Sequence, residues 1–145
     1  MVTAKEYLGR LTKLNLLINQ KLQEVSDLRA SLTSIPAVNT NEERVQGGSI
    51  KSDAGFVNSI AKIQMLEKET DAEIDKFVDK KHKIINEIQS LSNEKHIDIL
   101  FKKYVEFKRL EKVAVEMNYT YQYIVLLHGY ALKEFQKKFQ YKFND

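Results

Sequence analysis

Two long stretches of this chain place apolar side chains alternately three and four residues apart. The first seam runs from about Thr3 to Thr33 and consists of Tyr7, Leu11, Leu14, Ile18, Val25, Leu28 and Leu32. The second runs from about Phe56 to Leu91 and consists of Ile60, Ile63, Thr70, Ile74, Phe77, Ile84, Ile88 and Leu91. This spacing lines one face of a helix, and a helix with such a face is not stable alone in water. We therefore predict an all-α fold whose first part is a long antiparallel helical hairpin of the coiled-coil type.

The segment between the two seams has no apolar period. Residues 34–55 read SIPAVNTNEERVQGGSIKSDAG and contain the only proline and three of the five glycines. The pair Gly47-Gly48 is a strong breaker of regular structure. This segment is predicted to be a flexible loop that joins the two helices, long for a tight hairpin.

A hairpin of two helices leaves apolar surface uncovered, which favours self-association into a homo-oligomer. The expected interface consists of Leu11, Ile18, Val25, Ile74, Phe77 and Ile84. The alternative of equal weight is a hairpin that packs only on the rest of its own chain.

The last third of the chain contains three shorter helical patterns, which divides the chain into a hairpin domain (1–92) and a C-terminal domain (93–145). Their order matches a helix-turn-helix. Ala114 supplies the small residue where two helices cross, and Asn118 tolerates the positive φ of the turn. Thr120 can cap the following helix. The inner face of that helix would consist of Ile124, Leu127 and Ala131.

In a helix-turn-helix the outer face of the second helix enters the major groove. The residues expected to face bases are Thr120, Tyr121, Gln122, Val125 and Leu126. Those expected to contact phosphates are Lys108, Arg109, Tyr123 and Lys133. Tyr119 and Tyr130 are expected to be semi-buried aromatic residues that brace the motif.

The placement of charge also favours a polyanionic partner such as double-stranded DNA. Residues 1–93 carry thirteen basic and thirteen acidic side chains, whereas residues 94–145 carry ten and seven, so the net charge of +3 comes from the last third. Yet Asn118 to Leu132 contains no Lys or Arg. The positive charge would have to come from the flanks of the second helix.

Several classes of function have no support in the sequence. There is no cysteine, and the three histidines do not stand with further ligands at metal-binding spacing. Gly47-Gly48 lacks the flanking elements of a phosphate-binding loop. We predict a protein that is not an enzyme and binds no metal or cofactor. No run reaches the ~20 apolar residues of a spanning helix, so no membrane association is expected, and the cytoplasm is the expected location.

The segments YLGRL, SDAGFVNSIAKI and YVEFKRLEKVAVEMNYTYQYI resemble the phage and prophage regulators of the ArpU/RinA type and related streptococcal phage proteins. The last segment, with LHGYAL after it, is similar to the helix-turn-helix of sigma-factor region 4. The resemblance implies a transcriptional regulator of phage genes that acts in the cytoplasm of a bacterial host. In that family the recognition helix often carries Arg or Lys near Gln122, Leu126 or Tyr130, which this chain lacks.

Two functions from different classes follow. The first is a regulator that binds promoter DNA through the helix-turn-helix and self-associates through its N-terminal helices. The second is an interaction module that contacts RNA polymerase or another regulator and has little affinity for DNA. The basic flanks favour the first function, and the uncharged recognition helix favours the second.

Overall fold

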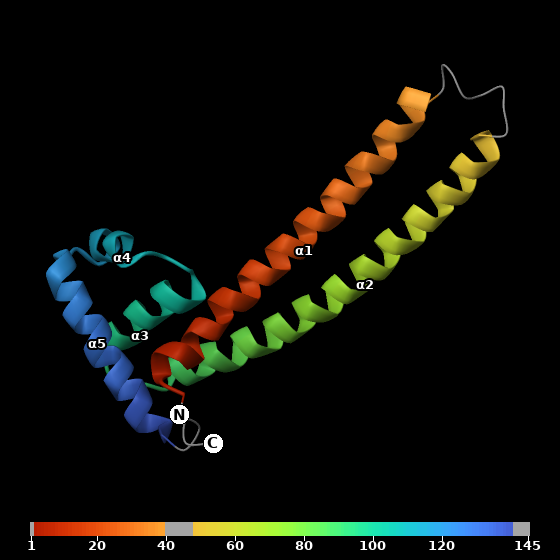
Figure 1. Cartoon of the computed structure of the whole chain (residues 1–145). Coiled ribbons are helices and arrows are strands. Elements are labelled where there is room, and N and C mark those ends of the chain that lie inside the picture. The colour runs from red at the N-terminus through yellow and green to blue at the C-terminus, as the bar shows by residue number, and fades with distance from the viewer. Residues whose placement is uncertain (1, 40–47, 141–145) are drawn as a thin grey trace. The chain divides into compact units, whose positions relative to one another are not determined.

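The computed structural model describes residues 2–39 and 48–140, and side chains within 2–32 and 55–140. The described residues are helical and include no strand (Figure 1). The α-helices are α1 (Ala4–Asn39), α2 (Gly48–Gln89), α3 (Glu94–Leu100), α4 (Leu110–Met117) and α5 (Tyr121–Lys138), and a π-helical segment, η1 (Phe101–Val105), follows α3. The prediction of an all-α fold is confirmed. None of the helices in the described ranges is long and apolar enough to cross a membrane.

The predicted loop at 34–55 is wrong at both of its ends. Helix α1 continues through Pro36 to Asn39, and α2 already begins at Gly48. Pro36 lies in the last turn of α1, and Gly48 lies at the first position of α2, so both residues that predicted a break fall inside the helical ranges. The absence of an apolar period therefore does not mark the end of a helix here. The prediction of flexibility for 40–47 lies outside the described residues.

The contacts group the chain into two compact units, and these differ from the predicted domains. Unit 1 contains residues 1–15 and 77–145, and unit 2 contains residues 16–76. The predicted boundary at 92 therefore falls inside unit 1. An apolar period identifies a buried helix face, but it does not say which part of the chain covers that face.

Unit 2 is the pairing of the middle parts of the two long helices. Ile18, Val25 and Ile63 are each less than a tenth exposed. Thr70, also buried, interrupts the apolar seam without leaving a polar group unpaired, since its hydroxyl donates to the carbonyl of Leu66 at 2.7 Å. These residues give the expected helix pairing its apolar contact.

The expected oligomer interface is largely covered within the single chain. Leu11 and Ile84 are fully buried in unit 1, and Ile18 and Val25 are nearly so in unit 2. Ile74 and Phe77 are partly buried. The side chains that were assigned to contacts between copies are used for contacts inside one copy, because the helices cover each other's seams. Self-association of the chain stays a prediction.

Unit 1 is built around one apolar core. It joins the start of α1 and the end of α2 to all of the shorter helices. Its fully buried side chains include Leu8, Leu11, Ile84, Ile88, Ile99, Leu100, Val113, Ile124 and Phe135. Within this core the Tyr7 hydroxyl donates to the Glu87 carboxylate at 2.6 Å, which supplies a partner for a buried carboxylate. The two ends of the long helices therefore belong to the same core as the C-terminal helices.

The helix that begins at Glu94 changes its winding after Leu100, where α3 gives way to η1. The Glu106 amide donates to the Phe101 carbonyl at 3.0 Å, five residues back, which is the bond of a π-helix. The chain then reverses at Phe107, whose φ of 59° lies in the left-handed region. This wider turn keeps Tyr104 and Val105 in the core.

Leu8→Ala should destabilise unit 1 by about 2–5 kcal/mol, because it leaves a cavity in a close-packed core. Urea unfolding followed by tyrosine fluorescence measures this directly, since all seven tyrosines lie in unit 1 and the chain has no tryptophan. Leu16→Ala is the matched control, because Leu16 is 54% exposed on the same helix. Equal effects of the two substitutions would mean that the start of α1 is not part of the core.

Candidate functional site

Helices α4 and α5 are joined by a tight turn whose geometry agrees with the sequence. Asn118 has φ 62° and ψ 42°, in the left-handed region. The Tyr119 amide donates to the Ala114 carbonyl at 3.0 Å, and Ala114 itself is buried. The Thr120 hydroxyl accepts a hydrogen bond from the Tyr123 amide at 3.2 Å and caps α5. The predictions for the turn, the cap and the small residue are confirmed.

The inner face of α5 is buried as predicted, and its outer face is open. Ile124, Leu127 and Ala131 lie in the core. The five side chains that were expected to face bases are all exposed: Thr120, Tyr121, Gln122, Val125 and Leu126. Tyr130, which was expected to be semi-buried, is 57% exposed and extends this surface. We call Tyr121, Gln122, Val125, Leu126 and Tyr130 the outer face of α5.

The outer face carries no charge. His128 is the only titratable side chain besides the tyrosines between Tyr121 and Leu132, and it is partly buried against Tyr104. Burial, aided by the charges of Lys103 and Lys5, lowers the pKa of His128 to about 4. Its Nε2 lies at hydrogen-bond distance, 2.7 Å, from the Tyr104 hydroxyl, and burial raises the pKa of Tyr104 to about 12. Both rings are therefore neutral at pH 7, and they stack with 5.6 Å between centroids.

The residues expected to contact phosphates differ in whether their polar groups already have partners within the chain. The Lys108 ammonium contacts Glu116 at 2.8 Å and Glu106 at 3.3 Å. The hydrogen bond with Glu116 is the main reason that the pKa of Lys108 is raised. Two carboxylates thus neutralise Lys108 and would repel a phosphate there, a feature that sequence reasoning missed. The side chain of Arg109 is exposed.

Tyr123 belongs to an aromatic cluster and is not an isolated hydroxyl. Its ring lies 4.6 Å from that of Tyr119, and the Lys95 ammonium stands 5.3 Å from the Tyr119 centroid and 5.9 Å from the Tyr123 centroid. Hydrogen bonds with the two tyrosines raise the pKa of Lys95. The cluster braces the start of α5, and this use of Tyr123 differs from its expected phosphate contact.

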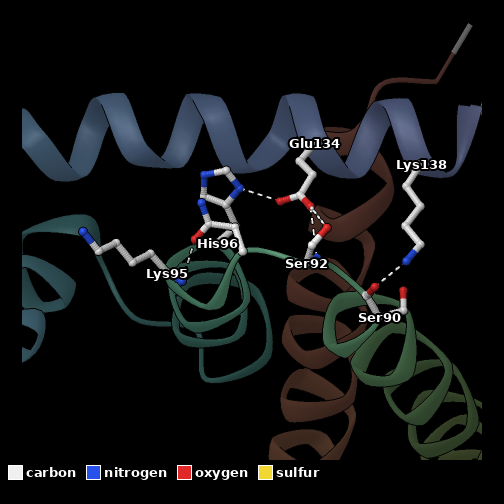
Figure 2. Close-up of polar contacts among 7 residues, drawn as sticks. Ser90, Ser92, Lys95, His96, Glu134 and Lys138 are labelled. Carbon is white, nitrogen blue, oxygen red and sulfur yellow. Dashed lines mark hydrogen bonds and ion pairs between the residues drawn. The ribbon is translucent and has the colours of Figure 1, made fainter.

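A polar network fixes the other half of α5 (Figure 2). The Glu134 carboxylate contacts His96 Nδ1 at 2.6 Å and accepts hydrogen bonds from the amide and hydroxyl of Ser92 at 3.1 and 3.2 Å. Burial by itself would raise the pKa of Glu134, but these bonds to His96 and Ser92 lower it. Lys138 donates to the Ser90 carbonyl. Since Ser92 and His96 flank the start of α3, the network holds α5 to the residues that follow α2.

The part of the chain with described side chains contains no group of three His, Cys, Asp or Glu side chains that could hold a metal ion. Comparison with protein-family models finds no match, and neither does comparison with curated proteins or with solved structures. The function must therefore be inferred from this site.

Asn118→Gly should leave stability unchanged or slightly raised, whereas Asn118→Val should cost about 1–2 kcal/mol, because a β-branched residue resists positive φ. Tyrosine fluorescence during urea unfolding compares the two variants with the original chain. A Val variant as stable as the original would show that the turn does not need the left-handed conformation.

Stability should fall as the pH drops from about 6.5 towards 4. The pKa of His128 is about 4 in the folded chain and its ordinary value is 6.5, so in this window the unfolded chain binds a proton that the folded chain does not. His128→Gln keeps an acceptor for Tyr104 but cannot titrate. Melting temperatures measured between pH 7 and 5 should fall less for this variant than for the original chain, and parallel curves would contradict the assignment.

Proposed function

We propose that residues 110–138 form a helix-turn-helix and that the chain is a transcriptional regulator that binds promoter DNA through it. The observation that carries this proposal is the outer face of α5. The left-handed turn at Asn118 and the buried inner face leave that surface exposed along the helix, and a recognition helix needs such a surface in order to enter the major groove. The resemblance to phage regulators points to the same function.

The outer face has the chemistry to read bases without charge. The Gln122 amide can pair with adenine through two hydrogen bonds, and Val125 and Leu126 can pack on thymine methyl groups. Tyr121 presents a hydroxyl that can donate to a base edge or a phosphate. We infer a preference for sites rich in A·T pairs.

A second function, contact with RNA polymerase or another regulatory protein, is favoured by a specific observation. Four of the five outer-face residues are apolar or aromatic and are 42–59% exposed: Tyr121, Val125, Leu126 and Tyr130. Aromatic residues are enriched and charged residues depleted at the centres of protein interfaces. DNA remains the better supported partner, because α5 continues beyond this face into Lys133 and Lys137.

Gln122→Ala should weaken binding to the preferred DNA site by about 1–3 kcal/mol, since it removes a contact to one base pair. Affinity for unrelated DNA and the dependence on salt should not change, because no charge is lost. The measurement is fluorescence anisotropy on a duplex selected from a random pool, with a scrambled duplex as the reference.

Leu126→Lys separates the two functions with the same assay. On a face that meets DNA, an added ammonium should strengthen binding to any duplex and steepen the slope of log K against log salt by roughly one unit. On a face that meets a protein, it would place a charge in an apolar contact. Loss of transcriptional activity with unchanged DNA affinity in both variants would favour the protein partner and overturn the DNA proposal.

A further inference from the structure

A cleft of about 430 Å³ lies where the first residues of α1 meet the second half of α5. Three lysines line it, Lys5 from α1 and Lys133 and Lys137 from α5. The rest of its lining includes Thr3, Leu132, Gln136 and Gln140. No acidic side chain lines the cleft.

A specific contact holds the start of α1 against α5. The Ala4 amide donates to the side-chain oxygen of Gln136 at 2.7 Å, and the Ala4 side chain is buried. Leu132 packs on the same core from α5. These contacts bring Lys5, which lies far from α5 in the sequence, beside Lys133 and Lys137.

The cleft lysines differ from Lys102 and Lys108, which are paired with carboxylates. Lys102 and Lys108 both contact Glu116, and Lys108 contacts Glu106 as well. Among the described side chains, neither Lys5 nor Lys133 nor Lys137 has an ion-pair partner, and Lys133 only stands over the Tyr130 ring at 5.7 Å. Three ammonium groups around one cleft repel one another unless an anion lies between them.

The cleft continues the outer face of α5. Positions 122, 126, 129, 133 and 137 follow at intervals of three or four residues and therefore lie on one side of the helix. Gln122 and Lys133 are roughly 16 Å apart along the helix axis at 1.5 Å per residue. That distance exceeds the width of the major groove, about 12 Å, so a helix whose start lies in the groove can bring its second half to the flanking phosphates.

We propose that the cleft formed by Lys5, Lys133 and Lys137 binds the DNA backbone phosphates that flank the base pairs facing Gln122. This inference rests on the proposed function and names the residues that supply its positive charge. The proposal assigns the main phosphate contacts to the cleft lysines and not to Lys108.

Gly129 supports a DNA backbone that runs along α5 from Gln122 to the cleft. It lies between Leu126 and Lys133 on the same side of the helix, and a Cβ atom added there would meet nothing within 4 Å. Glycine in a helix interior is less stable than alanine, and the packing of the chain does not require it here. Close approach of another molecule to the helix backbone does require a residue without a side chain.

The test measures binding of the full chain to duplex DNA over a range of salt concentrations. Lys5→Gln, Lys133→Gln and Lys137→Gln should each weaken binding to specific and scrambled duplexes alike, and each should lower the slope of log K against log salt by roughly one unit. Lys62→Gln is the control, since it removes the same charge from an exposed position in unit 2. Melting temperatures verify that every variant is folded.

Three outcomes separate this inference from the proposed function. A reduced slope for the cleft variants and an unchanged slope for Lys62→Gln would support it. If the three cleft variants bind duplex DNA as tightly as the original chain while Gln122→Ala binds its preferred site more weakly, the cleft proposal is overturned and the proposed function stands. Failure of the original chain to bind any duplex would overturn both.

Gly129→Ala tests the same path without a change of charge. The variant should melt at a higher temperature, because alanine stabilises a helix, and it should bind DNA several-fold more weakly, because its methyl group stands between helix and backbone. A more stable variant with unchanged affinity would overturn a route for the DNA from Gln122 to the cleft.

Discussion

The burial of Phe135 is the contact on which unit 1 depends. This side chain is fully buried, and its ring lies 6.0 Å from that of Tyr7 on α1 and 4.8 Å from that of Phe139. Because residues from both ends of the chain meet here, the orientation of α5 is set by the start of α1 as well as by α4. The core buries one side of α5, and this determines which side of the helix is left exposed.

Charge is distributed around α5 in a way that the net charge of the chain does not reveal. Near α4, Lys108 and Lys102 are paired with Glu116, and the carboxylate of Glu134 on α5 contacts His96 and Ser92. The outer face has no ionisable group other than tyrosine. Lys5, Lys133 and Lys137 line a cleft that has no acidic side chain in its lining, so uncharged and basic surfaces follow one another along α5.

The sequence predicts the features that depend on neighbouring residues. The bounds of α4, the positive φ of Asn118 and the cap by Thr120 follow from local geometry, and the buried side of α5 follows from its period. The sequence does not predict which distant segment of the chain covers a given helix face. Leu8 stands outside the expected seam yet is fully buried, and Phe107 adopts a positive φ that its residue type disfavours. The neutralisation of Lys108 and the position of Lys5 depend on contacts between distant segments, which no period encodes.

The division of unit 1 between the two ends of the chain limits how such a protein can evolve. Residues 1–15 and 77–145 share one core, and residues 16–76 are inserted between them. A recombination event that replaced only the C-terminal helices would join half of one core to half of another, whereas point substitutions on the outer face of α5 change its surface and leave the core intact. The inserted helices are free of this restriction, and their length can change without disturbing the residues around α5.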